Sequence, residues 1–492
     1  MIKKLAQTSF ITIILLLNST ISSAIDYEQG DWVGYTNFKY ITSIAADQRV
    51  VYFGTTGGII RYDRFMDKWL YPLTTTGGLP SNKIHRLAYE PNYDELWALT
   101  DKGAAKYNIT FAEWYPASDF PDSLVRNSWT PSRFTSLFTP FGYDYMNGYI
   151  TDPYMRRFSI MVGFEDIDDL MYIGTWGLGP AILNTRYQKI ELMPFGPFNY
   201  NISRLIRIGN DIWMGSDYML SEKAITKYSL DTQEWEYFEP EFVWGLNSSE
   251  LTSGIQTGNH VWLGTPEGLV RINGNNSLQT FSSLPSRYIL SLAEYGGFIY
   301  AGTKNGLGIV PTDGDMPDSS FKTPLSDEYH LRGFQVNDLL KFNGCLYIAT
   351  HDGAFCYDST HLKFRKIDTP THDLAYGVND IFSDGRYLYF GARFGVVIID
   401  VRADTSSVAT DHSYADRWQI NEVCSNDKYI WAATSIGLWR YRKADEETRL
   451  YTTADGLPTD YINSLIIDGN YLWLGTSRGM VRFLWDSPGR GD

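Results

Sequence analysis

The chain has 492 residues, of which 43% are hydrophobic and 15% aromatic, with 43 glycines but only 20 prolines. This length exceeds one ordinary domain unless the chain is a repeat array, and the many aromatic residues and glycines predict short strands joined by tight turns. The formal net charge of −15 argues against a nucleic-acid partner or an anionic membrane surface. Only three cysteines occur, so a disulfide framework cannot be the basis of stability.

The first residues predict a secretory signal peptide. Lys3 and Lys4 form a positive start, an apolar run follows at residues 10–17, and small residues end at Ala24. The apolar run is too short to span a bilayer, and no later stretch of the sequence is long enough. We therefore expect removal of residues 1–24, with cleavage near Ala24, and a mature chain of residues 25–492 in the periplasm or outside the cell.

One pattern recurs along the rest of the chain: an apolar residue, an aromatic residue, any residue, a small residue, and threonine or a near equivalent. A clear copy is Val261-Trp262-Leu263-Gly264-Thr265. The copies lie roughly 40 residues apart, which is the period of a four-stranded propeller blade. We therefore predict an all-β fold, a β-propeller of about ten four-stranded blades. The aromatic position reads Tyr52, Trp97, Tyr172, Trp213, Trp262, Tyr300, Tyr347, Tyr389, Trp431 and Trp473.

The two ends of the array predict how it closes. After Leu484 too few residues remain for the outer strand of the last blade, whereas residues 31–36 precede the first inner strand as an outer strand without a blade. We expect this N-terminal strand to complete the last blade, which removes an exposed sheet edge. The join at residues 277–292 resembles the other links between blades, so we favour one ring of ten blades. Two five-bladed propellers are the alternative.

The run Trp473-Leu474-Gly475-Thr476, followed by Gly479 and an apolar-x-Arg-aromatic segment, resembles the two-component-regulator propeller repeat. The Gly-Leu-Pro linker at residues 78–82, echoed at residues 456–460, shares this resemblance. That repeat fills the extracytoplasmic sensor region of hybrid histidine kinases, and similar propellers occur in the type IX secretion machinery. The resemblance implies a propeller that works outside the cytoplasm, and here it is carried without a kinase or a membrane span.

Three loops depart from the period, and loops on a rigid scaffold often carry function. The largest is an insert at about residues 117–157, which is rich in aromatic residues; a second loop at residues 239–250 holds Phe242 and Trp244, and a third at residues 311–333 is acidic and polar. The aromatic residues either form the insert's own small core over the channel or stack on a ligand. On the second interpretation the two aromatic loops form one recess, with Trp129, Tyr143, Tyr145 and Trp244 as its ligand-binding residues.

Histidines form a weaker candidate site. His330, His351 and His372 fall in loops on one predicted face of the seventh blade. Histidine beside carboxylates can bind a metal or transfer protons, and the propeller lyases that inactivate streptogramin antibiotics use histidine on such a face. No spacing rule supports a site, so solvated loop residues are the alternative, and we predict neither a metal site nor a cofactor. Cys345 and Cys356 flank one hairpin and either pair or remain buried thiols.

Three functions remain open at this point. We favour a secreted or periplasmic binding or scaffolding propeller, not an enzyme, that recognises a glycan, peptide or protein partner through loops at the channel mouth. One alternative is a hydrolase or lyase that uses histidine and aspartate there, and the other is a structural component of an envelope or secretion assembly. A broad exposed apolar patch would favour the scaffold, and polar groups that converge in the channel would favour the enzyme.

Overall fold

The computed structural model describes residues 27, 30–216, 223–274, 277–312, 331, 333–358, 363–370, 373–393, 395–403, 405–409 and 418–487. Within these residues the chain is all-β, and its strands form ten antiparallel sheets, most of them four-stranded. No helix in this part of the chain is both long and apolar enough to cross a membrane. Each sheet corresponds to one copy of the repeat, and we number the sheets blades 1 to 10 in the order of those copies.

The last copy shows how the repeat produces a blade from β39 (Ile462–Asp468), β40 (Tyr471–Thr476) and β41 (Gly479–Leu484). The hydroxyl of Thr476 donates a hydrogen bond to the carbonyl of Gly479 at 2.8 Å, which fixes the tight turn between β40 and β41. Gly479 has a φ of 116°, and a Cβ there would lie 2.2 Å from the carbonyl oxygen of Tyr35, so glycine is required. At the small position, a Cβ on Gly475 would already lie 3.1 Å from Ile202 of the neighbouring blade.

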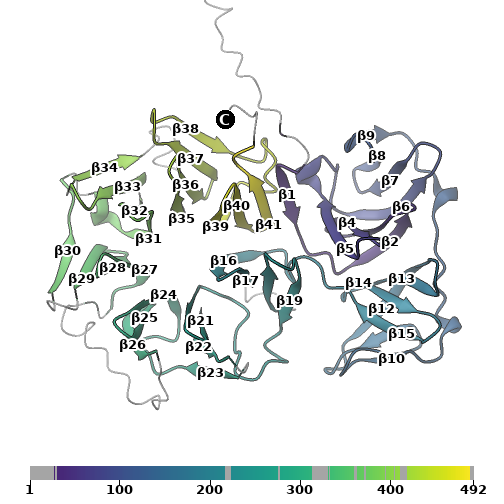
Figure 1. Cartoon of the computed structure of the whole chain (residues 1–492), viewed down its shortest axis with the longest axis horizontal. Coiled ribbons are helices and arrows are strands. Elements are labelled where there is room, and N and C mark those ends of the chain that lie inside the picture. Colours follow the sequence, from purple (N-terminus) through teal and green to yellow (C-terminus); the bar gives the residue numbers. More distant parts are fainter. Residues whose placement is uncertain are drawn as a thin grey trace, which may run out of the picture.

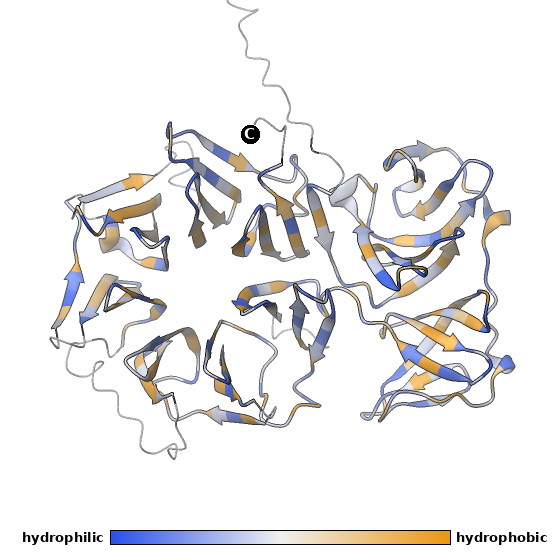
Figure 2. Cartoon of the chain, in the orientation of Figure 1, coloured by the Kyte–Doolittle hydropathy of each residue, from blue (hydrophilic) through white to orange (hydrophobic). Residues whose placement is uncertain are grey.

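Blades 4 to 10 surround a common axis and form what we call the ring (Figure 1). Figure 2 shows apolar residues along the strands of each blade. Buried clusters of such residues extend from one blade to the next, as from Trp431 to Ile462. Besides β39 to β41, the strands of the ring are β16 (Ile202–Ile208), β17 (Asp211–Ser216), β18 (Ile225–Ser229), β19 (Trp235–Phe238), β20 (Ser253–Thr257), β21 (His260–Thr265), β22 (Gly268–Ile272), β23 (Leu278–Phe281), β24 (Ile289–Tyr295), β25 (Phe298–Thr303), β26 (Gly306–Pro311), β27 (Val336–Phe342), β28 (Cys345–Thr350), β29 (Gly353–Asp358), β30 (Lys363–Ile367), β31 (Val378–Ser383), β32 (Tyr387–Ala392), β33 (Gly395–Asp400), β34 (Thr405–Ala409), β35 (Ile420–Ser425), β36 (Tyr429–Thr434), β37 (Gly437–Arg442) and β38 (Thr448–Tyr451).

Blades 1 to 3 lie beside the ring and form what we call the side module (Figure 1). Its chain is inserted between the first strand of the protein, β1 (Trp32–Tyr35), and the first ring strand, β16. The strands of the side module are β2 (Ile41–Ala46), β3 (Val50–Thr55), β4 (Gly58–Asp63), β5 (Lys68–Leu73), β6 (Ile84–Glu90), β7 (Glu95–Thr100), β8 (Gly103–Asn108), β9 (Glu113–Ala117), β10 (Asp144–Met146), β11 (Tyr149–Thr151), β12 (Arg157–Glu165), β13 (Leu170–Thr175), β14 (Pro180–Asn184) and β15 (Lys189–Leu192).

Strand β1 closes the ring, as the sequence predicted. It pairs antiparallel with β41, and Trp32 stands opposite Phe483 in the register. The aromatic side chains of Trp32 and Phe483 stack with their centroids 3.8 Å apart, and Trp32 is buried. The N-terminal strand therefore supplies the outer strand that the last copy of the repeat lacks.

The ring contains seven blades, because blade 10 packs against blade 4 rather than against blade 1. The side-chain amide of Asn463 on β39 donates to the carbonyl of Ile202 on β16 at 2.7 Å, and the backbone N–H of Leu205 donates to the hydroxyl of Ser464 at 3.0 Å. An equivalent hydrogen bond joins blades that are consecutive in sequence: the side-chain amide of Asn421 on β35 of blade 9 donates to the carbonyl of Ile462 on blade 10. Ten blades and closure by the N-terminal strand are thus confirmed, whereas the single ring of ten is wrong.

The side module departs from the ring at both of its ends. Tyr172 of blade 3 packs toward Phe53 of blade 1, with ring centroids 6.3 Å apart, so blade 3 is followed in space by blade 1 and not by blade 4. Blade 2 carries Leu99 at the position where the other blades have glycine or alanine, and no blade follows it. Its repeated aromatic residue, Trp97, is accordingly only half-buried, whereas the other nine are buried. A single core cluster, which includes Tyr35, Phe195 and Trp473, joins the side module to the ring.

Candidate functional site

The insert at residues 117–157 folds into a cap over blade 3. Its hairpin of β10 and β11 extends the sheet of blade 3 to six strands. The rest of the cap lays Phe134 and Leu137 on the face of blade 3 that has no neighbouring blade, where they join Met171 and Ile173 in one buried cluster. The aromatic residues of the insert therefore do form a core of their own, but this core covers an end blade and not the channel of the ring.

Two of the predicted ligand contacts lie inside this core. Trp129 and Tyr145 are only 7% and 6% exposed. Trp129 stacks on Phe134, and the hydroxyl of Tyr145 donates to the carbonyl of Phe134 at 3.3 Å while it accepts the N–H of Gly148 at 3.1 Å. Because packing occupies both side chains, we place them in the core rather than in a recess. In the sequence, an aromatic residue that covers a bare blade cannot be distinguished from one that binds a ligand.

The cap also meets the second aromatic loop, at a seam between the side module and blade 4. The rings of Tyr154 and Phe242 contact edge to face with centroids 4.3 Å apart. Beside them the guanidinium of Arg156 donates to Glu239 at 2.8 Å. Burial lowers the pKa of Arg156, but Asp152 and Glu239 raise it by more, whereas burial raises the pKa of Glu239. The ion pair from Arg156 to Glu239 and the contact between Tyr154 and Phe242 therefore both join the cap to this loop.

Around this seam lies an exposed group of rings that we call the aromatic surface: Phe141, Tyr143, Tyr154, Phe242 and Trp244. Phe141 and Trp244 are 104% and 95% exposed, and Tyr143 is half-buried. A Cβ on Gly142 would lie 3.1 Å from the ring of Pro153, so the turn that carries Phe141 lies against the turn that carries Tyr154. Residues 240–247 line an open hollow of about 580 Å³ beside Trp244. Of the four predicted contacts, only Tyr143 and Trp244 belong to this surface.

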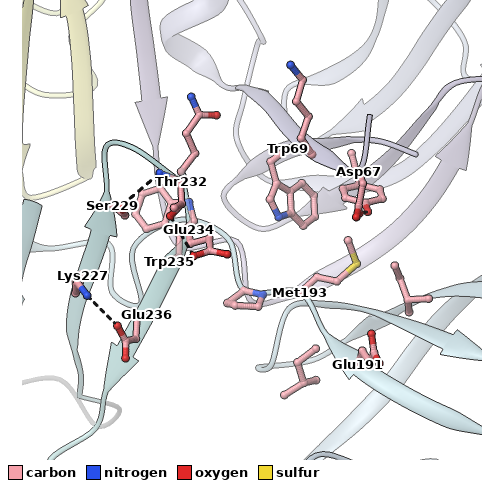
Figure 3. A pocket seen from close by; sticks show the side chains of 16 residues that line it. Asp67, Trp69, Glu191, Met193, Lys227, Ser229, Thr232, Glu234, Trp235 and Glu236 are labelled. Carbon is pink, nitrogen blue, oxygen red and sulfur yellow. Dashed lines mark hydrogen bonds and ion pairs between the residues drawn. The ribbon is translucent and has the colours of Figure 1, made fainter. Parts of the chain in front are cut away.

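A second concavity, which we call the junction cleft, lies where the side module meets the outer strands of blade 4 (Figure 3). Its volume is about 600 Å³. Trp69 on β5 and Glu191 on β15 come from the side module, whereas Lys227 and Trp235 come from β18 and β19 of the ring. The sequence did not predict this cleft, since its walls come from three copies of the repeat whose neighbours in space depend on the ring count.

The inner strands of the ring carry a charged group that sequence reasoning also missed. Asp338, Asp380 and Glu422 occupy equivalent positions on β27, β31 and β35 and accept the backbone N–H of the following blade at 2.8 to 2.9 Å. Arg204 on β16 lies 3.1 Å from Glu422 and 3.7 Å from Asp380. Burial raises the pKa of Asp338 to about 6 and that of Asp380 well above its usual range. The recurring sequence apolar-Asn-acidic in these strands was the available signal.

The histidine candidates are not assembled into a site by the described residues. His330 and His372 lie outside them. The Nδ1 of His351 accepts the N–H of Gln335 at 3.2 Å, and its Nε2 lies 3.9 Å from Asp352, so this exposed side chain stabilises a turn. Within the described ranges no group of three or more histidine, cysteine or acidic side chains is arranged to hold a metal ion.

The two cysteines for which the sequence left a disulfide open are free thiols. Cys345, on β28, is half-buried and Cys356, on β29, is buried. Burial, followed by contact with Cys345, raises the pKa of Cys356 to about 12. A thiol with so high a pKa is a poor nucleophile at neutral pH, so Cys356 behaves as a packing residue.

Comparisons with known proteins show the fold and nothing finer. No protein-family model and no curated protein matches the chain. The extracellular domain of the hybrid two component system BT4673 from B. thetaiotaomicron is similar, with a TM-score of 0.50 and 13% identity over 91% of this chain and 70% of that one. PorZ, a surface component of the type-IX secretion system of Porphyromonas gingivalis, has a TM-score of 0.48 and 14% identity over 90% of this chain and 68% of that one. Virginiamycin B lyase from Staphylococcus aureus has a TM-score of 0.43 and 12% identity over 57% of this chain and 94% of that one.

Proposed function

We propose that this chain is a non-catalytic recognition scaffold that works in the periplasm or outside the cell and docks a protein partner on the aromatic surface. The observation that carries this proposal is the exposure of Phe141 and Trp244 on the two segments that meet through Tyr154 and Phe242. Contiguous exposed apolar side chains are unfavourable in water and mark interaction sites in soluble proteins. Tryptophan and other aromatic anchors also dominate the energetics of protein interfaces.

The construction of the surface supports docking of a partner over catalysis. Its rings stand on a cap and a loop that the seam ion pair between Arg156 and Glu239 fixes to each other, so little order is lost when a partner binds. The signal peptide expected at residues 1–24 and the resemblance to the two-component-regulator propeller repeat favour a place outside the cytoplasm. The candidate catalytic residues His330, His351 and His372 stay a prediction that no described contact supports.

Site-specific crosslinking tests this function. A photoreactive phenylalanine at position 244 should capture a discrete protein in the envelope or secreted fraction, whereas the same group at Tyr93, another exposed aromatic position on blade 2, should not. The captured protein is then purified and its affinity measured against Phe141→Ser/Trp244→Ser and against the matched control Tyr93→Ser/Phe111→Ser.

We expect the first pair of substitutions to weaken binding by at least about a hundredfold, because two anchor residues are lost, and the control pair to leave it unchanged. Unchanged melting temperatures would show that both variants fold. Equal capture at positions 244 and 93, or equal affinities for the two double variants, would overturn the proposal.

A further inference from the structure

The junction cleft is a second concavity, separate from the aromatic surface. It spans the two parts of the molecule at the end of β19 that begins with Trp235, whereas the Phe242 loop follows the other end of that strand. Its volume of about 600 Å³ falls in the range of sites for small ligands. Figure 3 shows side chains from both parts directed into the space between them.

The cleft has an aromatic floor. Trp69 and Trp235 line it from the side module and from the ring, and Met193 and Pro194 line it as well. Beneath the floor the buried ring of Phe195 contacts both indoles, with centroids 4.7 Å from Trp69 and 5.9 Å from Trp235. Trp69 also packs edge to face on Tyr62 at 5.2 Å. Because these rings are fixed by packing, they offer a preformed surface.

The walls of the cleft are acidic. They carry four carboxylates, of Asp67, Glu191, Glu234 and Glu236, but only two amines, of Lys68 and Lys227. Lys227 forms ion pairs with Glu236 at 3.3 Å and with Asp211 at 3.5 Å. Glu191 forms an ion pair with Lys189 at 2.5 Å.

Asp67 and Glu234 differ from the other two carboxylates. Asp67 accepts the hydroxyl of Tyr62, and Glu234 accepts the hydroxyl of Thr232 at 3.0 Å. These donors are neutral, and among the described residues neither carboxylate has a cation within ion-pair distance. Asp67 belongs to the side module and Glu234 to the ring, and Trp69 lies between them in Figure 3.

We propose that the junction cleft binds a cationic side chain, an arginine or lysine presented by a peptide segment. An aromatic face attracts a guanidinium or ammonium group through the charge distribution of the ring, and a carboxylate on each side supplies charge-assisted hydrogen bonds. Arginine fits best, because its planar group can stack on Trp69 while its edges reach Asp67 and Glu234. An anionic ligand would be repelled, and a neutral one would leave both carboxylates without a counter-charge. The bound group joins the side module to the ring.

Isothermal titration of the full mature chain with three short peptides tests this site. The peptides are acetyl-Gly-Arg-Gly-amide, its lysine analogue, and its citrulline analogue, in which a neutral urea of the same shape replaces the guanidinium. We expect arginine to bind more tightly than lysine, citrulline to bind at least about tenfold more weakly than arginine, and added salt to weaken binding.

Two variants locate the binding in the cleft. Asp67→Asn and Glu234→Gln should each weaken arginine binding about tenfold, whereas Glu113→Gln, an exposed carboxylate on β9, should have no effect. Asparagine tolerates the left-handed backbone of position 67, where φ is 52°, so that variant keeps its turn. Equal binding of arginine and citrulline, binding of a neutral oligosaccharide such as maltohexaose in place of arginine, or no heat with any peptide would overturn the proposal.

Discussion

Asp338 is one of the three acidic residues on the inner strands of the ring, and its replacement, Asp338→Asn, should make the stability of the protein depend less on pH. Burial raises the pKa of Asp338 to about 6 in the folded protein, whereas an aspartate in an unfolded chain titrates near pH 4, by the usual value of about 3.9. The folded state therefore binds this proton more tightly than the unfolded state. The stability that depends on Asp338 is fully present below about pH 4 and is lost as the pH rises through about 6.

The size of this effect follows from the two pKa values. Their difference corresponds to at most about 3 kcal/mol, and solvent that reaches the half-buried side chain reduces it to about 1–2 kcal/mol. Asparagine keeps the acceptor for the N–H of Ile381, which is bonded at 2.9 Å in the native chain. Arg204 retains Glu422 and Asp380 as partners. The substitution thus removes a charge with little change in packing.

Urea unfolding at about pH 5 and about pH 7.5 measures the effect. The free energy of unfolding of Asp338→Asn should exceed that of the native chain at the higher pH and approach it at the lower pH. Asp119→Asn, which removes an exposed carboxylate, is the control and should leave the difference between the two pH values as it is in the native chain. Parallel pH profiles for Asp338→Asn and the native chain would refute the reasoning.

Three further changes test the blades, the closure and the seam. Trp262→Ala should cost on the order of 3–5 kcal/mol, because that ring is fully buried between blades. Trp97→Ala should cost only about 1 kcal/mol, since no blade follows it; equal losses in urea unfolding would contradict this contrast. Deletion of residues 31–36 should lower the melting temperature and cause aggregation through the bare edge of β41, detected by light scattering, and an unchanged melting temperature would count against closure by β1. Arg156→Met keeps an apolar stem beside Phe242 but removes the bond to Glu239, so hydrogen exchange should rise at residues 239–247 while the ring stays protected; unaltered exchange would show that this ion pair does not hold the seam.

The blade itself could be predicted from the sequence because every feature of the repeat has a local cause. The aromatic residue fills the space between blades, the small residue admits the next blade, and the threonine fixes the turn before the glycine, as Thr476 does for Gly479. The missing outer strand could also be located, since Trp32 and its neighbours form a strand with no blade of their own. These inferences need only contacts within one copy of the repeat, or the pairing of the first strand of the array with the last.

The number of blades in the ring could not be predicted in the same way, because it depends on which blades pack together across long stretches of chain. One residue did contain a signal. Leu99 stands where a following blade requires glycine or alanine, and it marks blade 2 as the end of a stack. The place of the cap could not be predicted for a related reason: Trp129 and Tyr145 cover a bare blade face whose existence follows from the ring count. The junction cleft follows from the same arrangement and has no signature within any single repeat.

The path of the chain through the ring also governs the order in which the molecule can be completed. Strand β1 is synthesised long before its partner β41, and the bond from Arg482 to Tyr71 joins residues 411 positions apart. During synthesis β1 has no ladder partner while the side module and six blades are made. Contacts so distant in sequence form slowly, and an open arc of blades exposes the edge of β41 until they do. A chaperone that shields this edge would therefore act on the last step of folding, after every blade except the closing one is complete.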